Sequence, residues 1–254
     1  IAESAIKSIA PGTLLPIGAM MLMGTLSAHA QTTNVADVKT LPTVTVVEKA
    51  DQLQGKDTLR ATTTTIGKGK QELRDIPQSI TVVTEKLIDD RNLDTLKDVL
   101  HNTAGVTFLA AEGGEEDIRL RGFSLATTGD IFVDGMRDPA FYDRDTFAND
   151  RIELLRGSAS MLFGRGSTGG AVNQVTKQPR AIDEHEVTTT LGSYNYRRVT
   201  GDFNIRTGED SGLRINAMTT AADNNGAGSS IDKKGIAVGY RWGIGTADEF
   251  SATL

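Results

Sequence analysis

The stretch from residue 151 to residue 179 constrains the fold of this chain more than any other part of it. It opens with a mostly apolar run, Ile152–Leu155, and continues through Gly157 to a second apolar run, Met161–Phe163. Four more glycines follow, at positions 164, 166, 169 and 170, and lead into the β-branched run Ala171–Thr176. Glycine adopts φ > 0 readily and lets other backbone approach closely. The pattern therefore predicts a strand–turn–strand unit.

Three of these glycines, Gly164, Gly166 and Gly169, have the spacing of the dinucleotide-binding fingerprint. That fingerprint must leave a strand and open a helix. Here the glycines precede an alternating run that is typical of a strand, and no lysine follows them as it would in a phosphate-binding P-loop. The spacing alone keeps a secreted nucleotide-using enzyme as an alternative, which the context disfavours.

The whole stretch resembles the hallmark segment in the plug domain of the TonB-dependent outer-membrane receptors. The positions in register with that segment are Arg151, Ile152, Glu153, Leu155, Arg156, Gly157, Ser160, Leu162, Gly164, Gly166, Gly169, Gly170, Val172, Asn173, Val175, Thr176, Lys177 and Pro179. Ser158 stands where the family usually has proline, and Phe163 where it usually has tyrosine. Neither departure changes the glycine spacing.

Residues 75–180 are expected to form the plug, an α+β domain with a small mixed sheet and short helices. Four further motifs of the family's plug occur in the same order, at Pro77–Thr84, Thr103–Val106, Ile118–Phe123 and Val133–Gly135. Between the first two, apolar residues recur with helical spacing, and the pattern breaks near Asn92.

The N-terminal part is expected to be exported and then flexible. Residues 1–30 have the pattern of a cleaved signal peptide, with an apolar segment that ends in Ala28-His29-Ala30. Residues 31–74 are rich in threonine and polar residues, which predicts a flexible tether. The resemblance implies that this tether carries the TonB box, a strand that TonB captures by β-augmentation. Its residues are Pro42, Thr43, Val44, Thr45, Val46 and Val47. The alternative is that they form the first strand of the plug.

Residues 186–254 are expected to form the first antiparallel strands of a transmembrane β-barrel. Val199–Ile205, Leu213–Ala217 and Ile236–Trp242 each alternate apolar with polar residues, and the last run ends in aromatic residues. A soluble β-sandwich is the alternative. Only four strands and the start of a fifth fit in this length, whereas a plugged transporter has about 22. The barrel is therefore expected to be incomplete, with the chain an N-terminal fragment or a truncated gene product.

Composition excludes several other classes of protein. The net charge of −6 argues against a nucleic-acid partner. There is no cysteine, and the three histidines are far apart, so we expect no metal site. No catalytic constellation is recognisable, and we expect neither an enzyme nor a bound cofactor.

The resemblance implies an outer-membrane receptor that imports a ferric siderophore and is energised by TonB. A catecholate cargo is slightly favoured, and haem or cobalamin remains an alternative cargo. By position, the residues implied to contact the ligand are Arg137, Phe141, Tyr142 and Arg144, although they could instead only brace the plug. Arg121 and Arg156 each precede a glycine and are implied to latch the plug to acidic residues of the barrel wall. The resemblance also implies that the protein is embedded in the lipid of the outer membrane of a Gram-negative cell.

Overall fold

The computed structural model describes residues 56–110, 116–138, 142–164, 168–223 and 228–254. The expected signal peptide, the TonB-box residues 42–47 and Phe141 lie outside these ranges. The described part contains a mixed domain, residues 63–176, and a long antiparallel sheet, residues 184–253, which we call the wall sheet.

A five-stranded mixed sheet forms the centre of the mixed domain. Its strand order is β3 (Ser79–Thr84), β9 (Asn149–Arg156), β10 (Gly170–Thr176), β7 (Ile131–Val133) and β8 (Met136–Arg137). β10 runs parallel to β7 and antiparallel to β9. The two central strands are almost wholly buried, so both faces of the sheet must be covered.

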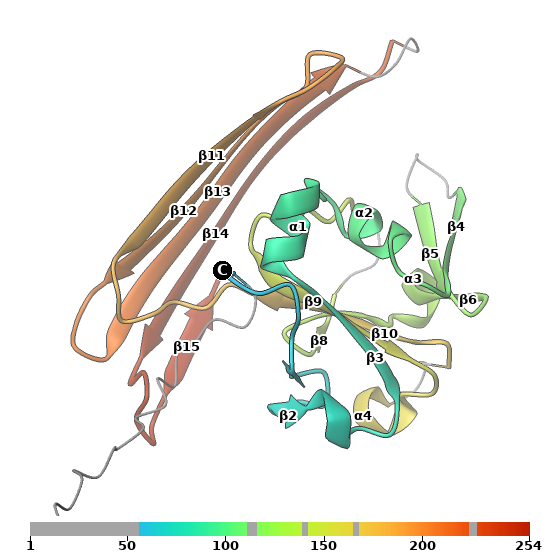
Figure 1. Ribbon diagram of the computed structural model, residues 1–254, viewed down its shortest axis with the longest axis horizontal. Helices are drawn as coiled ribbons and strands as arrows, with labels where there is room; N and C mark the ends of the chain where they lie inside the picture. Colours follow the sequence, from blue (N-terminus) through green and yellow to red (C-terminus); the bar gives the residue numbers. More distant parts are fainter. Residues whose placement is uncertain (1–55, 111–115, 139–141, 165–167, 224–227) are drawn as a thin grey trace, which may run out of the picture. The chain divides into compact units, whose positions relative to one another are not determined.

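Helices cover the two faces of this sheet unequally (Figure 1). α1 (Glu85–Arg91) and α2 (Leu96–His101) pack Ile88, Leu96 and Val99 against one face in the larger hydrophobic cluster. The expected break between them is confirmed, because Asn92 ends α1 in the left-handed conformation with φ 50°. A three-stranded sheet, β4 (Val106–Ala110), β5 (Glu116–Leu120) and β6 (Phe123–Ser124), and the short α3 (Leu125–Thr128) complete this side.

The other face carries a segment that the sequence assigned to the flexible tether. β1 (Thr63–Thr64) pairs with β2 (Gln71–Glu72), and η1 (Leu73–Asp75), a 3-10 helix of one turn, follows. Ile66, between β1 and β2, is only 2 % exposed. Ile66 packs in a second cluster with Phe132, Leu155 and residues of α4 (Ser160–Phe163). In this part the structure differs from the expected flexible tether, because β1 pairs with β2 and the side chains of Thr63, Thr64 and Ile66 are buried.

The glycine-rich stretch joins two paired strands, as its composition predicts, although the connection contains α4 and is longer than a tight turn. The glycines lead into β10 and not into a helix. A Cβ on Gly170, which has φ +144°, would lie 2.1 Å from the backbone oxygen of Leu155. At Gly169 it would lie 2.3 Å from the oxygen of Leu120. Close backbone packing is thus the reason for glycine at these two positions.

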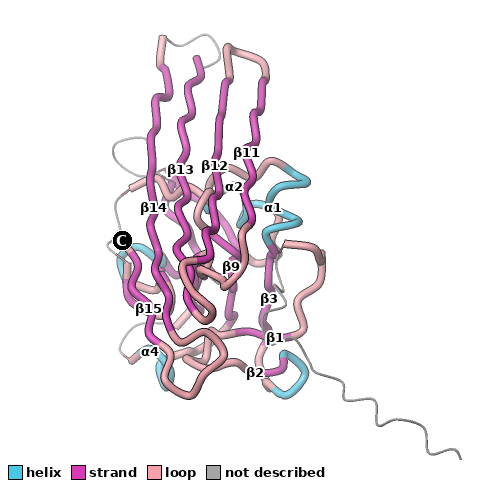
Figure 2. The backbone as a smooth tube through the Cα atoms, turned by 90° about the vertical axis from the view of Figure 1, so that its left-hand side faces the viewer, coloured by secondary structure: helices cyan, strands magenta, loops and turns pink. Residues whose placement is uncertain are grey.

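The wall sheet is antiparallel throughout, with neighbouring strands joined in chain order (Figure 2). Its strands are β11 (Glu184–Leu191), β12 (Arg197–Arg206), β13 (Ser211–Asp223), β14 (Ser230–Trp242) and β15 (Phe250–Thr253). Four strands and the start of a fifth were expected, and the structure has this number. None of the helices in the described ranges has the length and apolar character that a membrane span requires.

Candidate functional site: the wall sheet, its interface and the 138–146 loop

The wall sheet has its apolar residues on the outside. On β12, Val199 is 41 % exposed, whereas its neighbour Arg198 is 6 % exposed and Asn204 is 1 % exposed. On β13, Arg214 is among the largest fully buried side chains of the described chain. A water-soluble sheet buries its apolar face and exposes the polar one. The reversed pattern is that of a strand with lipid on one side and a polar interior on the other.

Aromatic residues collect at one end of this apolar face. Trp242 ends β14, Phe250 begins β15, and the two are paired in register with ring centroids 6.0 Å apart. Both are more than half exposed. Exposed aromatic rings next to a short turn suit the interface between hydrocarbon and water.

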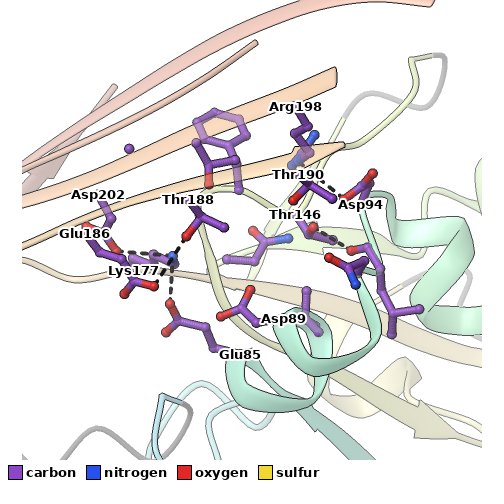
Figure 3. Close-up of a pocket in the computed structure, with 17 residues that line it drawn as sticks. Glu85, Asp89, Asp94, Thr146, Lys177, Glu186, Thr188, Thr190, Arg198 and Asp202 are labelled. Carbon is purple, nitrogen blue, oxygen red and sulfur yellow. Dashed lines mark hydrogen bonds and ion pairs between the residues drawn. The ribbon is translucent and has the colours of Figure 1, made fainter. Parts of the chain in front are cut away.

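The polar face of the wall sheet is joined to the mixed domain by buried charges. Lys177, directly after β10, places its Nζ 2.7 Å from Glu85 Oε1 on α1 and 3.2 Å from Asp202 Oδ2 on β12 (Figure 3). Asp202 also accepts bonds of 2.8 and 2.5 Å from the guanidinium of Arg214. These side chains are at most 13 % exposed. Each charge therefore depends on its partners for compensation.

A second connection lies further along β12. The guanidinium of Arg198 contacts Asp145 at 2.6 Å and Asp94 at 3.3 Å. Lys233 of β14 pairs with Asp143 in the same loop of the mixed domain. The interface is thus built from exchangeable charge pairs more than from an apolar core.

Between these two connections lies a cavity of about 200 Å³. Its acidic lining residues on the mixed-domain side are Glu85, Asp89 and Asp94, and Glu186 and Asp202 face them from the wall sheet (Figure 3). Burial raises the pKa of Glu85, of Asp89 and of Asp94 above the ordinary value for each carboxyl. For Glu85 the attraction of Lys177 opposes this effect without cancelling it. The site is polar and partly closed.

Two of the residues expected to contact a ligand are brought together in the 138–146 loop. Arg144 Nε lies 2.5 Å from Asp138 Oδ2, and the hydroxyl of Tyr142 donates to the same oxygen at 2.8 Å. The guanidinium carbon of Arg144 is 4.4 Å from the centre of the Tyr142 ring. Tyr142 is 50 % exposed and Arg144 only 6 %. A ligand could therefore reach the tyrosine ring, while Arg144 supports it from behind.

Arg137 makes different contacts from Arg144. It donates to the carbonyls of Thr128 and Gly129 at 3.0 and 2.5 Å, and to that of Phe163 at 3.1 Å. Its guanidinium also lies over the ring of Phe132, 5.4 Å from the centroid. These contacts tie β8 to α3 and α4, which matches the bracing alternative more closely than ligand contact.

Arg121 and Arg156 lie near each other on the mixed domain. Burial, and then the positive charge of Arg121, lower the pKa of Arg156. Arg156 donates to the carbonyl of Ala104 at 2.9 Å and to the hydroxyl of Thr81 at 2.7 Å. In the described ranges neither guanidinium has a carboxylate partner. Two neighbouring cations without an anion fit the expectation that an acidic group from elsewhere joins them.

The described residues contain no group of three or more His, Cys, Asp or Glu side chains that could hold a metal ion. Four of the acidic residues around the cavity pair with three different cations: Glu85 and Asp202 with Lys177, Asp94 with Arg198, and Glu186 with Lys56.

Comparison with known proteins decides what the mixed domain is. Residues 72–171 match the family model described as "TonB-dependent Receptor Plug Domain". The mixed domain is the plug of a TonB-dependent receptor. The α+β fold with a small mixed sheet, followed by the first strands of a receptor barrel, is thereby confirmed.

Several proteins resemble the chain beyond the plug. It is 34 % identical to the "Probable TonB-dependent receptor BfrD" of Bordetella pertussis, over 92 % of this chain and 31 % of that protein. It is 31 % identical to the "Catecholate siderophore receptor Fiu" of Escherichia coli, over 71 % of this chain and 24 % of that protein. The chain thus spans about a quarter to a third of the length of these relatives.

Solved structures agree with this family. The crystal structure of the siderophore receptor PiuA from Acinetobacter baumannii matches with a TM-score of 0.70 at 27 % identity, over 80 % of this chain and 29 % of that one. The open form of the ferric-catecholate import receptor Fiu from E. coli K12 matches with a TM-score of 0.67 at 29 % identity, over 72 % and 27 %.

Sequence reasoning missed the charge network around Lys177. Asp202 and Arg214 were visible only as members of the polar face of alternating strands. That they meet Glu85 and Lys177 depends on how the plug packs on the wall sheet, because Glu85 and Asp202 are far apart in the chain. Glu153, which is wholly buried on β9, was noted only as part of the plug motif.

Proposed function

We propose that this chain supplies the plug and the first barrel strands of an outer-membrane receptor that imports a ferric siderophore. The observation that carries the proposal is the reversed wall sheet, with apolar side chains outside and buried arginines against a plug inside. Such a wall suits a membrane pore that is closed by a movable domain. The proposed role is transport, and no catalytic step is part of it.

A siderophore cargo is supported by what the relatives are. The names of Fiu and PiuA refer to siderophores, and that of Fiu to catecholates. Ferric tris-catecholates are anionic, and the 138–146 loop offers an exposed tyrosine ring with a cation behind it. An aromatic face and a hydroxyl can contact a catechol ring, and Arg144 adds positive potential nearby. We therefore favour a catecholate over haem or cobalamin, and we place Tyr142 at the ligand.

The interface of the plug is suited to movement. Charge pairs such as Lys177 with Asp202 and Arg198 with Asp145 can be exchanged for water, whereas an apolar interface would resist separation. Arg121 and Arg156, which have no carboxylate partner among the described residues, would bind acidic side chains of further barrel strands. In this proposal they form the latch on the side of the plug that the present wall sheet does not cover.

Energy would reach the plug through the segment Pro42–Val47, which precedes the described residues. An extended Thr/Val segment can add as a strand to an open sheet edge of TonB. Ligand binding favours release of this segment only as far as the ligand binds the released state more tightly. Residues 1–30 would direct export and then be removed.

The test is uptake of an iron-55-labelled ferric tris-catecholate by cells that carry the complete gene with Val44→Pro. Proline removes a backbone N–H from the strand that TonB would bind, so uptake should fall to the level of cells lacking TonB. Val35→Pro, in the expected tether but outside residues 42–47, is the matched control and should leave uptake unchanged. Normal uptake with Val44→Pro would overturn the proposed role of this segment. Absence of uptake by the unaltered protein would reject this cargo.

A further inference from the structure

A fully buried carboxylate, that of Glu153, lies at the centre of the plug sheet on β9. Its Oε1 accepts a bond of 2.9 Å from the backbone N–H of Thr65 and another of 2.9 Å from Arg151 Nε. Its Oε2 accepts a bond of 3.2 Å from Nδ2 of Asn173 on β10. A buried charge persists only when its hydrogen bonds are satisfied, so these contacts are interdependent.

Asn173 on β10 connects Glu153 to the edge of the sheet that β7 and β8 form. Its Oδ1 accepts a bond of 2.9 Å from the backbone N–H of Gly135, and the side chain is 1 % exposed. Gly135 and Asp134 form the two-residue turn between β7 and β8, both with positive φ. Such a turn is stiff, so a displacement of β8 moves the N–H of Gly135 with it.

β8 leads directly into the loop that is proposed to contact the ligand. Asp138 is the next residue after β8, its N–H donates to Ile131 at 3.0 Å, and its carboxylate holds both Tyr142 and Arg144. An uninterrupted chain of contacts thus runs from this loop through Gly135, Asn173 and Glu153 to Thr65.

Thr65 belongs to the segment Lys56–Glu72, which we call the strap because it is the described part nearest the N-terminus and crosses one face of the plug sheet. Inside the plug it is held by the burial of Ile66, by the bonds from Thr65 to Glu153, and by a bond of 3.0 Å from Arg151 Nη2 to the Thr65 hydroxyl. Lys56 adds pairs with Glu184 and Glu186 on β11, which are partly exposed and therefore weak. Any pull on the chain before residue 56 must act on these attachments.

We propose that Glu153 and Asn173 are positioning residues that couple the 138–146 loop to the strap. When the loop holds Asp138 in place, Asn173 is oriented to donate to Glu153, and Glu153 keeps the N–H of Thr65. When the loop shifts, that bond weakens and the strap detaches more readily. This coupling deepens the proposed function, but its test needs neither a siderophore nor TonB, so it can fail while import stands.

The test measures amide hydrogen exchange of the strap by mass spectrometry, on the complete gene product in detergent. Asn173→Asp keeps the acceptor for Gly135 but sets a carboxylate against Glu153. A bond to a charged group is lost, so exchange of the strap should rise about tenfold or more. Glu153→Gln should also raise it, because a neutral acceptor holds Thr65 less strongly.

The double variant Asn173→Asp/Glu153→Gln separates coupling from simple destabilisation. The introduced amide can donate to the introduced carboxylate and still accept from Thr65, so exchange should return toward the wild-type rate. Independent destabilisation at the two positions predicts that the two effects add. Gln174→Glu makes the same amide-to-acid change at the next buried residue of β10 and should leave the strap unchanged.

The loop is tested with Asp138→Asn, which should speed exchange of the strap in the wild type but not further in Asn173→Asp. If Asp138→Asn also loosens β9 and β10, Tyr142→Phe replaces it as the milder variant. A nitroxide on Leu59→Cys, which is exposed in a chain without cysteine, reports strap mobility independently. Additive effects in the double variant, or an equal response to Gln174→Glu, would overturn the proposal.

Discussion

Replacing Lys177 by methionine tests whether the buried charges hold the plug on the wall sheet. The substitution keeps the volume of the side chain and leaves Glu85 and Asp202 without their shared cation. Removal of one partner from a buried pair costs about 3–5 kcal/mol. Asp202 keeps both bonds to Arg214, and Glu85 can become neutral by taking up a proton, so we expect about 2 kcal/mol here.

The assay is amide hydrogen exchange of α1 and the end of β10, converted to a local opening free energy. About 2 kcal/mol corresponds to roughly 30-fold faster exchange at pH 8. The double variant Lys177→Met/Glu85→Gln removes both charges and should recover most of the loss. Lys86→Met, which breaks an exposed pair with Asp90 on the same helix, should cause no measurable change.

The deficit, meaning the local opening free energy that Lys177→Met loses relative to the wild type, should also depend on pH. Burial already raises the pKa of Glu85, and loss of the Lys177 cation raises it further. A carboxyl with a raised pKa in the folded state binds its proton more readily when folded, so stability is gained as the pH falls through the window above the ordinary value of 4.5. The deficit of Lys177→Met should therefore shrink between pH 8 and pH 5. A deficit below about 0.5 kcal/mol at pH 8, or one that pH does not alter, would refute the reasoning.

Two further substitutions test the turn and the ligand loop. Gly170→Ala should destabilise the plug by about 3 kcal/mol, because its Cβ would meet the oxygen of Leu155 at 2.1 Å. Gly164→Ala should cost only about 1 kcal/mol, because nothing lies within 4 Å of its Cβ and only its φ of +80° is unfavourable. Amide hydrogen exchange of β10 measures both effects. Tyr142→Ala should weaken binding of a ferric tris-catecholate about tenfold by fluorescence quenching, whereas Tyr240→Ala on the outer face should not, and equal affinities would remove Tyr142 from the ligand site.

Local chemistry predicted much of this fold. The helix break at Asn92, the strand after the glycines and the alternation of Val199 with its polar neighbours each follow from nearby residues. The strap was missed because its composition is polar and Ile66 is its only residue in the hydrophobic cluster, with Thr65 adding bonds to Glu153. No composition average detects one residue that fills a cluster formed by distant strands.

The contacts of the site depend on packing and could not be predicted in this way. Lys177 meets Asp202 only because the plug rests against β12, and nothing in the spacing of the two residues indicates it. The expected grouping of Arg137 with Arg144 rested on matching their positions to a ligand-facing loop of the family's plug. In the structure the direction of β8 sends Arg137 toward Phe163, while the loop returns Arg144 to Asp138.

The most direct test of the reversed wall sheet is nitroxide accessibility at neighbouring positions of β12 in the complete gene product in bilayers. Val199→Cys and Thr200→Cys are suitable, since the chain has no cysteine and the two side chains point to opposite faces. The label at 199 should collide with oxygen dissolved in the lipid, and the one at 200 should be shielded from it. A water-soluble nickel complex that reaches position 199 as readily as position 200 would contradict a lipid-facing outer surface.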